Sequence, residues 1–224
     1  MAQIDGQDGG AIGRRRRAAQ VAGGEEYNSK RREVIHVAAT VFQEKGYKSA
    51  TLNDVAAALD TDRATLYYYV SGKEELLREA VFVYVLEIVE DIRRIATSDA
   101  PASEKLREFI TRLMDAYEAH YPHPYVFIQE KLDDAFRLDT EWARELVSIV
   151  GELQGQVTGI VEQGVRDGEF RTDVAPDLVV NGMFGMINWT HRWYRPGSSR
   201  HTGKDIGVSF ANIFLEGLQA DPPA

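Results

Sequence analysis

The side chains best suited to binding another molecule lie close together, between residues 63 and 73. They can hydrogen-bond to base edges and phosphates or allow close approach to a thymine methyl group: Arg63, Ala64, Thr65, Tyr67, Tyr68, Tyr69 and Lys73. Because successive helical residues point about 100° apart, three consecutive tyrosines cannot all be buried in one helix. The segment therefore predicts a surface that contacts nucleic acid.

These side chains need a rigid frame, and helical periodicity predicts one. Three helices are expected, over residues 29–45, about 51–59 and 63–70. Gly46 ends the first, Thr51 and Asp54 have capping-box spacing at the start of the second, and a polar corner at 60–62 precedes the third. Two short helices behind a longer one are typical of a helix-turn-helix, whose second short helix enters the major groove.

The distribution of charge supports this interpretation. A formal net charge of -9 at first argues against nucleic acid, because phosphate backbones attract cations. Between residues 14 and 73, however, eleven Lys or Arg stand against seven Asp or Glu, so this segment carries +4 and the remainder -13. A basic front with an acidic body is expected of a DNA-facing module attached to a domain that stays off the DNA. In the alternative interpretation, Tyr67 and Tyr69 belong partly to the core and the cations only solubilise the chain.

The rest of the chain is also helical by its periodicity, so the expected fold class is all-α with about nine helices. Ser71 and Glu74 repeat the capping spacing and begin a long fourth helix. The later helices are expected at residues 103–120, 123–137, 139–167, 176–194 and 203–219. We divide the chain into a flexible basic arm at 1–27, a helix-turn-helix domain at 28–73 and a second helical domain at 74–224.

The composition disfavours several classes of protein. The chain has no cysteine, which removes disulfides, thiolate nucleophiles and cysteine-based zinc sites. No stretch is apolar enough to span a bilayer and the first residues lack the apolar core of a secretory signal, so we expect a cytoplasmic protein. No nucleophile, base and orienting residue share a meaningful spacing, and no catalytic residue or cofactor is predicted. Glu118, His120 and His123 suggest a metal, but no further clear ligand accompanies them and no metal site is predicted.

Three stretches closely resemble the DNA-binding domain of the TetR family. They are Thr51-Leu-Asn-Asp-Val-Ala, Arg63-Ala-Thr-Leu-Tyr-Tyr-Tyr-Val and Ser71-Gly-Lys-Glu-Glu-Leu-Leu. The resemblance covers about residues 29–86 and implies a DNA-binding transcriptional regulator. It implies that DNA is approached by Thr51, Asn53, Arg63, Ala64, Thr65, Tyr67, Tyr68, Tyr69 and Lys73. Many members carry His at the position of Tyr69 and Phe-Pro-Ser in place of residues 70–72, which leaves the base preference open.

Four consecutive arginines precede the first predicted helix: Arg14, Arg15, Arg16 and Arg17. They form either an arm that enters the minor groove or attracts phosphates, or a tail that only solubilises the chain. An engaged arm raises affinity and salt dependence with little effect on specificity.

The resemblance also implies that residues 74–224 bind a small-molecule effector and form a dimer. The candidate pocket residues are Tyr117, Tyr121, Tyr125, Phe127, Phe136, Trp142, Leu146, Phe184, Trp189 and Arg192. For each single aromatic residue, core packing is the commoner role, but as a group they predict a sizeable apolar pocket.

The segment at residues 189–197 is similar to one in TetR-like repressors of fatty-acid and steroid breakdown, several of which sense acyl-CoA thioesters. Arg192 and Arg195 in this segment can meet a phosphate-bearing ligand or end a helix favourably at its negative pole, and the second role is preferred for Arg195. An opposite possibility is a cationic drug held against aromatic rings by acidic side chains, the candidates being Glu130, Asp133 and Asp134.

Two helices near the C-terminus carry surfaces suited to a homodimer. Their candidate interface residues are Gly182, Gly185, Phe210, Ile213, Phe214 and Gly217. Two such helices from each subunit would form a four-helix interface across a two-fold axis. Symmetry then predicts a palindromic operator in double-stranded DNA, with half-sites about one helical turn, or a multiple of it, apart.

The leading hypothesis is a repressor that a small-molecule ligand releases from its operator. The alternatives are a regulator of drug efflux that senses cationic lipophilic compounds, an all-α ligand carrier or enzyme that uses the C-terminal cavity, and an architectural protein that coats DNA without ligand control.

Overall fold

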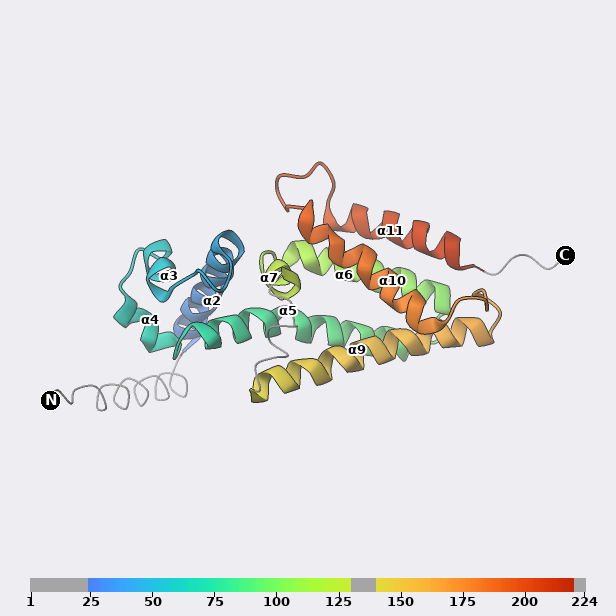
Figure 1. The fold of residues 1–224 in the computed structure, drawn as a ribbon, viewed down its shortest axis with the longest axis horizontal. Helices are drawn as coiled ribbons and strands as arrows, with labels where there is room; N and C mark the ends of the chain where they lie inside the picture. Colours follow the sequence, from blue (N-terminus) through green and yellow to red (C-terminus); the bar gives the residue numbers. More distant parts are fainter. Residues whose placement is uncertain (1–23, 130–139, 220–224) are drawn as a thin grey trace. The chain divides into compact units, whose positions relative to one another are not determined.

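Helices joined by short connections make up the chain in the computed structural model, which describes residues 24–129 and 140–219 (Figure 1). These two ranges hold nine α-helices and one 3-10 helix, and their only strand-like pairing is an isolated bridge between Phe170 and Gln219. The prediction of an all-α fold with about nine helices is therefore confirmed. None of the described helices is long and apolar enough to cross a membrane. Predicted site residues outside the described ranges are Arg14, Arg15, Arg16, Arg17, Glu130, Asp133, Asp134 and Phe136.

The chain divides into two compact units, Met1–Phe82 and Val83–Ala224. The first contains α2 (Glu25–Lys45), α3 (Leu52–Ala58), α4 (Arg63–Tyr69) and the start of α5 (Lys73–Ala96). The second contains the rest of α5, α6 (Ala102–Ala119), α7 (His123–Gln129), α9 (Glu141–Arg166), α10 (Pro176–Asn188), the 3-10 helix η1 (Trp189–Arg192) and α11 (Gly203–Leu218).

The first turns of α5 belong to the N-terminal unit, so the division lies later than the predicted boundary after residue 73. One reason is a partly buried ion-pair cluster. The guanidinium of Arg31 in α2 lies 3.3 Å from Glu75 and 3.1 Å from Glu79 of α5. Removing either partner from such a cluster leaves a charge with poor access to water, so the cluster holds these helices in one arrangement.

Helix α2 begins earlier than the sequence pattern indicated. It starts at Glu25, inside the segment predicted to be a flexible arm, and Tyr27 in its first turn is buried. The Tyr27 ring stacks on Tyr69 and meets Tyr68 edge-on, with centroid separations of 5.3 and 5.5 Å. Contacts between residues 41 or more positions apart stabilise this turn, and helical periodicity cannot detect them.

At the start of α5, Ser71 makes a capping interaction, but with a different acidic residue from the one predicted. Ser71 was expected to pair with Glu74, but its backbone N–H and hydroxyl both donate to the carboxylate of Glu75, over 2.7 and 2.6 Å. The helix begins at Lys73, two residues after Ser71, so the carboxylate that reaches back belongs to the third helical residue.

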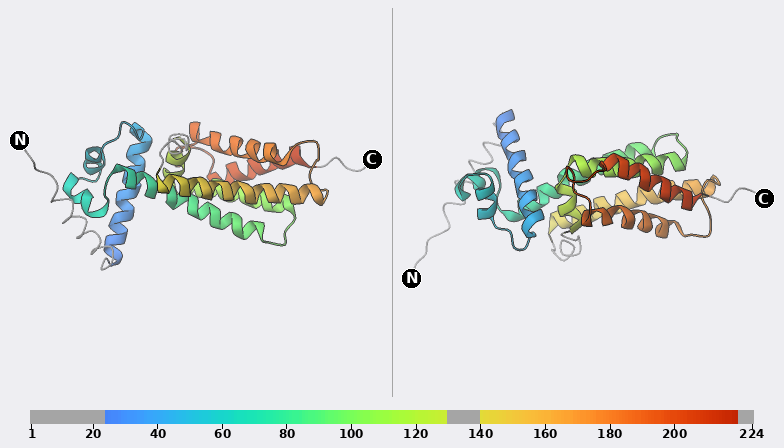
Figure 2. Two further views of the ribbon diagram at one scale, coloured as in Figure 1. Left: turned by 60° about the horizontal axis from the view of Figure 1, so that its bottom comes forward. Right: turned by 90° about the horizontal axis from the view of Figure 1, so that it is seen from above.

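In the C-terminal unit, α6 and α11 lie side by side, as the views of Figures 1 and 2 show. Two glycines of α11 permit this approach. A Cβ added at Gly203 would lie 2.3 Å from the Met114 carbonyl oxygen, and one at Gly207 would lie 2.8 Å from the Cα of Thr111. Only glycine allows backbones to come this close, so the pair fixes the spacing of the two helices.

Two predicted helices of this unit need comparison at their C-terminal ends. One ends earlier than predicted, and the other can be compared only over its described residues. The helix expected over 176–194 leaves α-helical geometry after Asn188 and continues as η1, where the buried Thr190 hydroxyl donates to the carbonyl of Ile187 over 2.7 Å. Short 3-10 turns of this kind are common at helix C-termini. The helix expected over 123–137 is described as α7 to Gln129, and the rest of that prediction lies outside the described residues.

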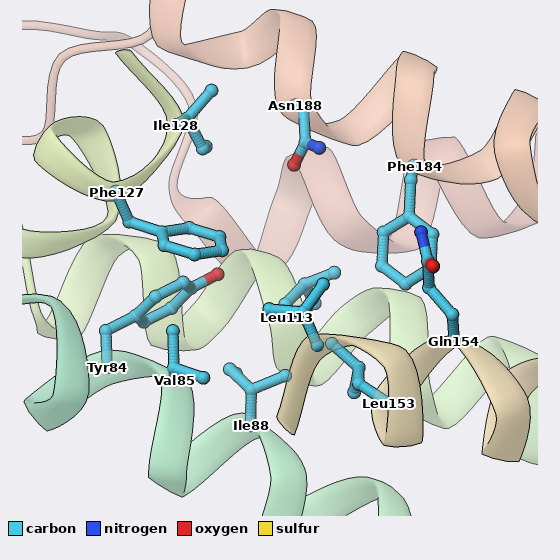
Figure 3. A pocket seen from close by; sticks show the side chains of 11 residues that line it. Tyr84, Val85, Ile88, Leu113, Phe127, Ile128, Leu153, Gln154, Phe184 and Asn188 are labelled. Carbon is cyan, nitrogen blue, oxygen red and sulfur yellow. The ribbon is translucent and has the colours of Figure 1, made fainter. Parts of the chain in front are cut away.

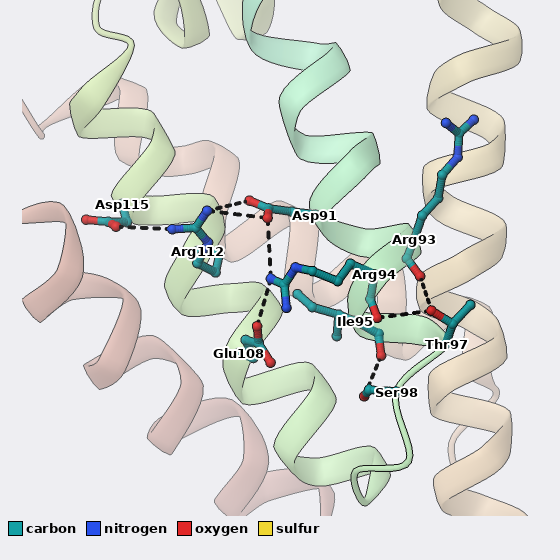
Figure 4. A network of polar contacts seen from close by, with 9 residues as sticks. All are labelled: Asp91, Arg93, Arg94, Ile95, Thr97, Ser98, Glu108, Arg112 and Asp115. Carbon is teal, nitrogen blue, oxygen red and sulfur yellow. Dashed lines mark hydrogen bonds and ion pairs between the residues drawn. The ribbon is translucent and has the colours of Figure 1, made fainter.

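Polar contacts tie the C-terminal half of α5 to its neighbours (Figure 4). Asp91 accepts hydrogen bonds from Arg94 and from Arg112 of α6, and Arg94 also donates to Glu108. On another side, Arg93 makes a bidentate pair with Glu152 of α9, over 2.7 and 2.9 Å. Because the arginines are half exposed, each pair adds little stability, and the buried apolar faces hold the bundle together.

Candidate nucleic-acid interface and ligand cavity

The loop before α3 is fixed by a complete capping box. The Thr51 hydroxyl accepts from the Asp54 N–H over 3.2 Å, and the Asp54 carboxylate accepts from the Thr51 N–H over 2.8 Å. Lys45 also pairs with Asp54, over 2.6 Å. This lysine and the two bonds from Thr51 lower the pKa of Asp54 to about 2. The predicted cap is confirmed, and it leaves Thr51 and Asn53 exposed at the N-terminus of α3.

The corner between α3 and α4 is equally well defined. Asp60 has a positive φ of 50°, which lets the chain turn, and the Thr61 N–H donates back to the Ala56 carbonyl over 3.0 Å. Asp62 then caps α4 by accepting from the Thr65 N–H over 2.7 Å, which lowers the pKa of its carboxyl group. These local bonds set the direction in which α4 leaves the corner.

Helix α4 presents one buried and one exposed face. Leu66 is its only fully buried side chain, and Val70, which follows it, is also buried. Arg63, Ala64 and Thr65 are exposed. A helix of seven residues held by one apolar anchor and one cap offers most of its surface to a partner.

The three tyrosines of α4 differ in their surroundings. Tyr68 is 40% exposed, whereas Tyr67 and Tyr69 are half-buried. The Tyr67 hydroxyl accepts from the Arg63 guanidinium over 2.7 Å, and burial against Tyr27 and Tyr68 raises the pKa of Tyr69. The partial burial of Tyr67 and Tyr69 matches the alternative interpretation for these two rings, while Tyr68 and Arg63 stay on the exposed face.

The ammonium of Lys73 is occupied within the protein. It donates to the carbonyl oxygens of Tyr47 and Ala50, over 2.7 and 2.9 Å, and lies 4.4 Å from the centre of the Tyr47 ring. These bonds hold the loop that carries Thr51. From the sequence, Lys73 could be identified only as a cation next to the third predicted helix, because the carbonyl groups that it binds belong to residues 23 or more positions away.

A second site lies in the C-terminal unit, as a cavity of about 190 Å³. Its lining residues are all uncharged: Tyr84, Val85, Ile88, Leu113, Phe127, Ile128, Val150, Leu153, Gln154, Phe184 and Asn188 (Figure 3). The sequence therefore supplies two separate kinds of site, a polar and exposed helix-turn-helix and an apolar interior cavity.

Comparison with known proteins identifies this combination. A model of bacterial regulatory proteins of the tetR family matches residues 34–80, and a model of the tetracyclin repressor-like C-terminal domain matches residues 99–218, more than half of the chain. The chain belongs to the TetR family. It is therefore a DNA-binding transcriptional regulator, and α4 is its recognition helix. Its partners are operator DNA, a second copy of itself and a small-molecule effector.

Individual TetR-family relatives match along most of their length. The HTH-type transcriptional repressor KstR2 of Mycobacterium tuberculosis is 29% identical over 200 residues, which cover 89% of this chain and 96% of that protein. KstR2 of Rhodococcus jostii is 28% identical over 195 residues, or 85% and 92% of the two chains. The solved structure of the ketosteroid transcriptional regulator KstR2 of M. tuberculosis has a TM-score of 0.78 at 26% identity, covering 87% of this chain and 97% of that one.

Only part of the predicted pocket set lines the cavity of this TetR-family chain. Phe127 and Phe184 do, and Trp142 and Leu146 are buried in α9 outside the lining. The lining residues that sequence reasoning missed are mainly aliphatic ones of α5 and α9. Their spacing marked them as buried, but it could not distinguish a cavity wall from solid core.

The predicted tyrosines on α6 and α7 form a separate aromatic cluster next to η1. Tyr117 lies 6.1 Å from Tyr121, which lies 6.5 Å from Tyr125. The guanidinium of Arg195 lies 4.7 Å from the Tyr125 ring and donates to the carbonyls of His191 and Tyr194, which is the helix-ending role preferred for this arginine. Trp189 and Arg192 are exposed and stack on each other at 5.1 Å.

The histidines considered for a metal have other neighbours. His120 lies 2.5 Å from Glu87, His123 is buried, and Glu118 accepts from the backbone N–H of Gly203. Within residues 24–129 and 140–219, no group of three or more histidine, cysteine or acidic side chains could hold a metal ion.

The predicted dimer residues of α10 and α11 differ in exposure. Gly182, Gly185, Ile213 and Gly217 are exposed, with Ile213 at 65%, while Phe210 and Phe214 are half-buried. Other exposed large apolar side chains are Leu178 of α10, Val208 of α11, Trp189 of η1 and Trp193, which follows η1. A row of this kind is costly in water and is typical of a surface that pairs with another chain.

Proposed function

We propose that the protein is a repressor whose dimer binds a palindromic operator and is released when a neutral and mainly apolar group of a small-molecule effector occupies the cavity. The cavity lining carries this proposal. Within residues 24–129 and 140–219 its lining residues are mainly apolar and none is charged, so they suit an apolar group and offer an ionised group no counter-charge. The effector need only bind the released conformation better than the DNA-bound one. We place the protein in the cytoplasm, where operator DNA is found.

We assign the DNA contacts to the exposed side of the helix-turn-helix. The proposed contact residues are Thr51, Asn53, Arg63, Ala64, Thr65, Tyr67, Tyr68 and Tyr69. The capped helix ends support this, because they hold the short helices rigid, and Thr51, whose hydroxyl caps α3, belongs to that support as well as to the proposed contact surface. Lys73 acts in this scheme mainly by holding the loop that carries Thr51. The run Arg14, Arg15, Arg16 and Arg17 adds phosphate attraction.

We assign dimerisation to the exposed apolar surfaces of α10 and α11, centred on Gly182, Gly185, Ile213 and Gly217. The exposed glycines support a close approach of helices, because a partner backbone meets no side chain there. A two-fold axis through this surface places the same residues opposite their own copies.

For the effector we propose a molecule with an apolar group that enters the cavity. Acyl-CoA thioesters are one class to test, because their acyl chain is neutral and apolar although their phosphates are charged. KstR2 of M. tuberculosis, a relative of known structure, is a ketosteroid transcriptional regulator. AibR, whose fold is similar at a TM-score of 0.68 and 20% identity, was crystallised with isovaleryl coenzyme A and operator DNA. A cationic drug is the weaker candidate, because none of the residues that line the described cavity is charged.

A gel-shift titration with the DNA upstream of the protein's own gene tests the regulator function. Wild type should retard this DNA, and Tyr68→Ala should weaken binding about tenfold or more, as expected for loss of a base-contacting aromatic side chain. Val147→Ala removes an apolar side chain of similar exposure, 41%, from α9 and should bind like wild type. The proposal fails if wild type and Tyr68→Ala both leave the DNA unretarded.

Thermal-shift screening then separates the effector classes. A ligand that binds the folded state raises the melting temperature in proportion to its occupancy. We expect neutral apolar compounds or acyl-CoA thioesters to stabilise the protein and to reverse the gel shift, and cationic dyes to do neither. Stabilisation by dyes alone would favour the drug-sensing alternative.

A further inference from the structure

The first residue of the recognition helix has its charged group held in a defined place. Arg63 begins α4 and is exposed. Its Nη2 group donates to the Tyr67 hydroxyl oxygen over 2.7 Å, and its guanidinium carbon lies 5.4 Å from the centre of the Tyr67 ring. Residues four positions apart lie on the same side of a helix, so the pair forms without distorting α4.

A neutral group, and not a carboxylate, holds this guanidinium. The nearest carboxylate in the sequence, that of Asp62, accepts from the Thr65 N–H over 2.7 Å and caps the helix. Within residues 24–129 and 140–219, Arg63 forms no ion pair, and the Tyr67 hydroxyl is its only hydrogen-bond partner. Its positive charge therefore remains available to a partner outside the protein.

The bond also leaves most of the hydrogen-bonding capacity of both side chains unused. A guanidinium carries five N–H donors in a rigid plane, and Tyr67 accepts from one of them, so an edge with two parallel N–H groups remains. Such an edge matches the O6 and N7 acceptors of guanine in the major groove. Because the Tyr67 oxygen acts as the acceptor here, its own proton is free to be donated to a phosphate oxygen.

Arginine can bind a phosphate with the same edge, but two features of α4 favour a base. Arg63 is the first residue of the helix, and the N-terminal residues of a recognition helix are the ones that reach base edges. The next two residues, Ala64 and Thr65, are small and exposed, so this end of α4 can approach the groove closely.

We propose that Arg63 binds a guanine in each half-site of the operator and that Tyr67 positions its guanidinium for this contact. The inference rests on the proposed function, and it adds one base of the operator and the residue pair that recognises it. Fixing a long side chain on binding costs conformational entropy, and the bond to Tyr67 restricts Arg63 before DNA arrives. A phosphate contact by Tyr67 then links the placement of the helix to the recognition of sequence.

The test measures base preference and not only affinity. The full chain selects duplexes from a randomised DNA library, and fluorescence anisotropy then gives dissociation constants for the selected operator and its single-base-pair variants. We expect one guanine in each half-site whose replacement weakens wild-type binding about five- to hundredfold, and we expect Arg63→Ala to lose this preference. Tyr67→Phe keeps the ring without the hydroxyl and should reduce the same preference about two- to tenfold.

Two controls separate positioning from a general effect on the helix. Tyr68→Phe removes a hydroxyl from an exposed neighbour that is not a hydrogen-bond partner of Arg63, and it should leave the preference at this guanine unchanged. In the double variant Arg63→Ala/Tyr67→Phe, the second substitution should reduce the preference no further than Arg63→Ala alone, because the group that Tyr67 positions is already gone.

Three results would overturn the proposal while leaving the proposed function intact. The first is that Arg63→Ala weakens binding to all duplexes equally and lowers the salt slope by about one, which indicates a phosphate contact. The second is that Tyr67→Phe keeps the full preference for guanine, and the third is that the two substitutions act additively on it. If wild type selects no sequence from the library, the proposed function fails together with this inference.

Discussion

Replacing Gly207 by alanine tests how closely α6 and α11 must pack. The new Cβ would lie 2.8 Å from the Cα of Thr111 and 3.1 Å from its carbonyl oxygen, and neither backbone atom can rotate away. Overpacking of this kind costs about 1–3 kcal/mol, while replacing a helical glycine by alanine returns about 1 kcal/mol. We therefore expect Gly207→Ala to lower the free energy of unfolding by up to about 2 kcal/mol.

Gly155→Ala is the matched control. Gly155 also lies inside a helix, but a Cβ at this position meets nothing within 4 Å, so only the helical gain of about 1 kcal/mol remains. The two variants should differ by about 1–3 kcal/mol, or about 2–12 °C in melting temperature for a chain of this size. Urea and thermal unfolding at one fixed protein concentration measure the difference, because dimer stability depends on concentration. Equal stability of the two variants would refute the close-packing argument.

Three further predictions concern the N-terminal unit. Leu66→Ala removes the one fully buried side chain of α4 and should lower the free energy of unfolding by about 2–5 kcal/mol in urea titrations; a loss below about 1 kcal/mol would show that α4 does not depend on this anchor. Asp54 has a pKa of about 2 against an unperturbed 3.8, so its contribution to stability is present above about pH 4 and is lost as the pH falls towards 2. The urea midpoints of wild type and Asp54→Asn should therefore differ at pH 6 and converge near pH 2, and a gap that does not depend on pH contradicts this. Lys73→Met should lower the urea midpoint and leave the salt dependence of operator binding unchanged, whereas a slope smaller by about one would indicate a direct phosphate contact.

Much of the helix-turn-helix could be predicted because its signals are local. Thr51 and Asp54 cap α3 through bonds three residues apart, Asp62 caps α4 in the same way, and Gly46 ends α2 with a φ of 75°. Such contacts form between neighbours in the chain, so residue type and spacing are sufficient to identify them. The same is true of the apolar stripes that predicted the helices of the C-terminal unit.

The ligand cavity was less accessible to sequence reasoning. Of the aromatic residues predicted as a group, Phe127 and Phe184 line the cavity, while Trp142 is buried outside the lining. Whether a buried residue meets another side chain or an empty space depends on elements that come together from distant parts of the chain.

The sequence by itself determined the fold class, the position of the recognition helix and the chemistry of its exposed residues, because helix formation and capping depend on neighbours within a few positions. Tertiary structure alone decided that Tyr27 extends α2 by packing on Tyr68 and Tyr69, that Lys73 binds loop carbonyls, and that the Tyr117 hydroxyl is buried with no hydrogen-bond partner among residues 24–129 and 140–219. The first two outcomes depend on residues 20 or more positions apart that packing brings together. The third depends on the lack of a hydrogen-bond acceptor near the Tyr117 hydroxyl among the described residues. No periodic pattern in the sequence encodes such contacts.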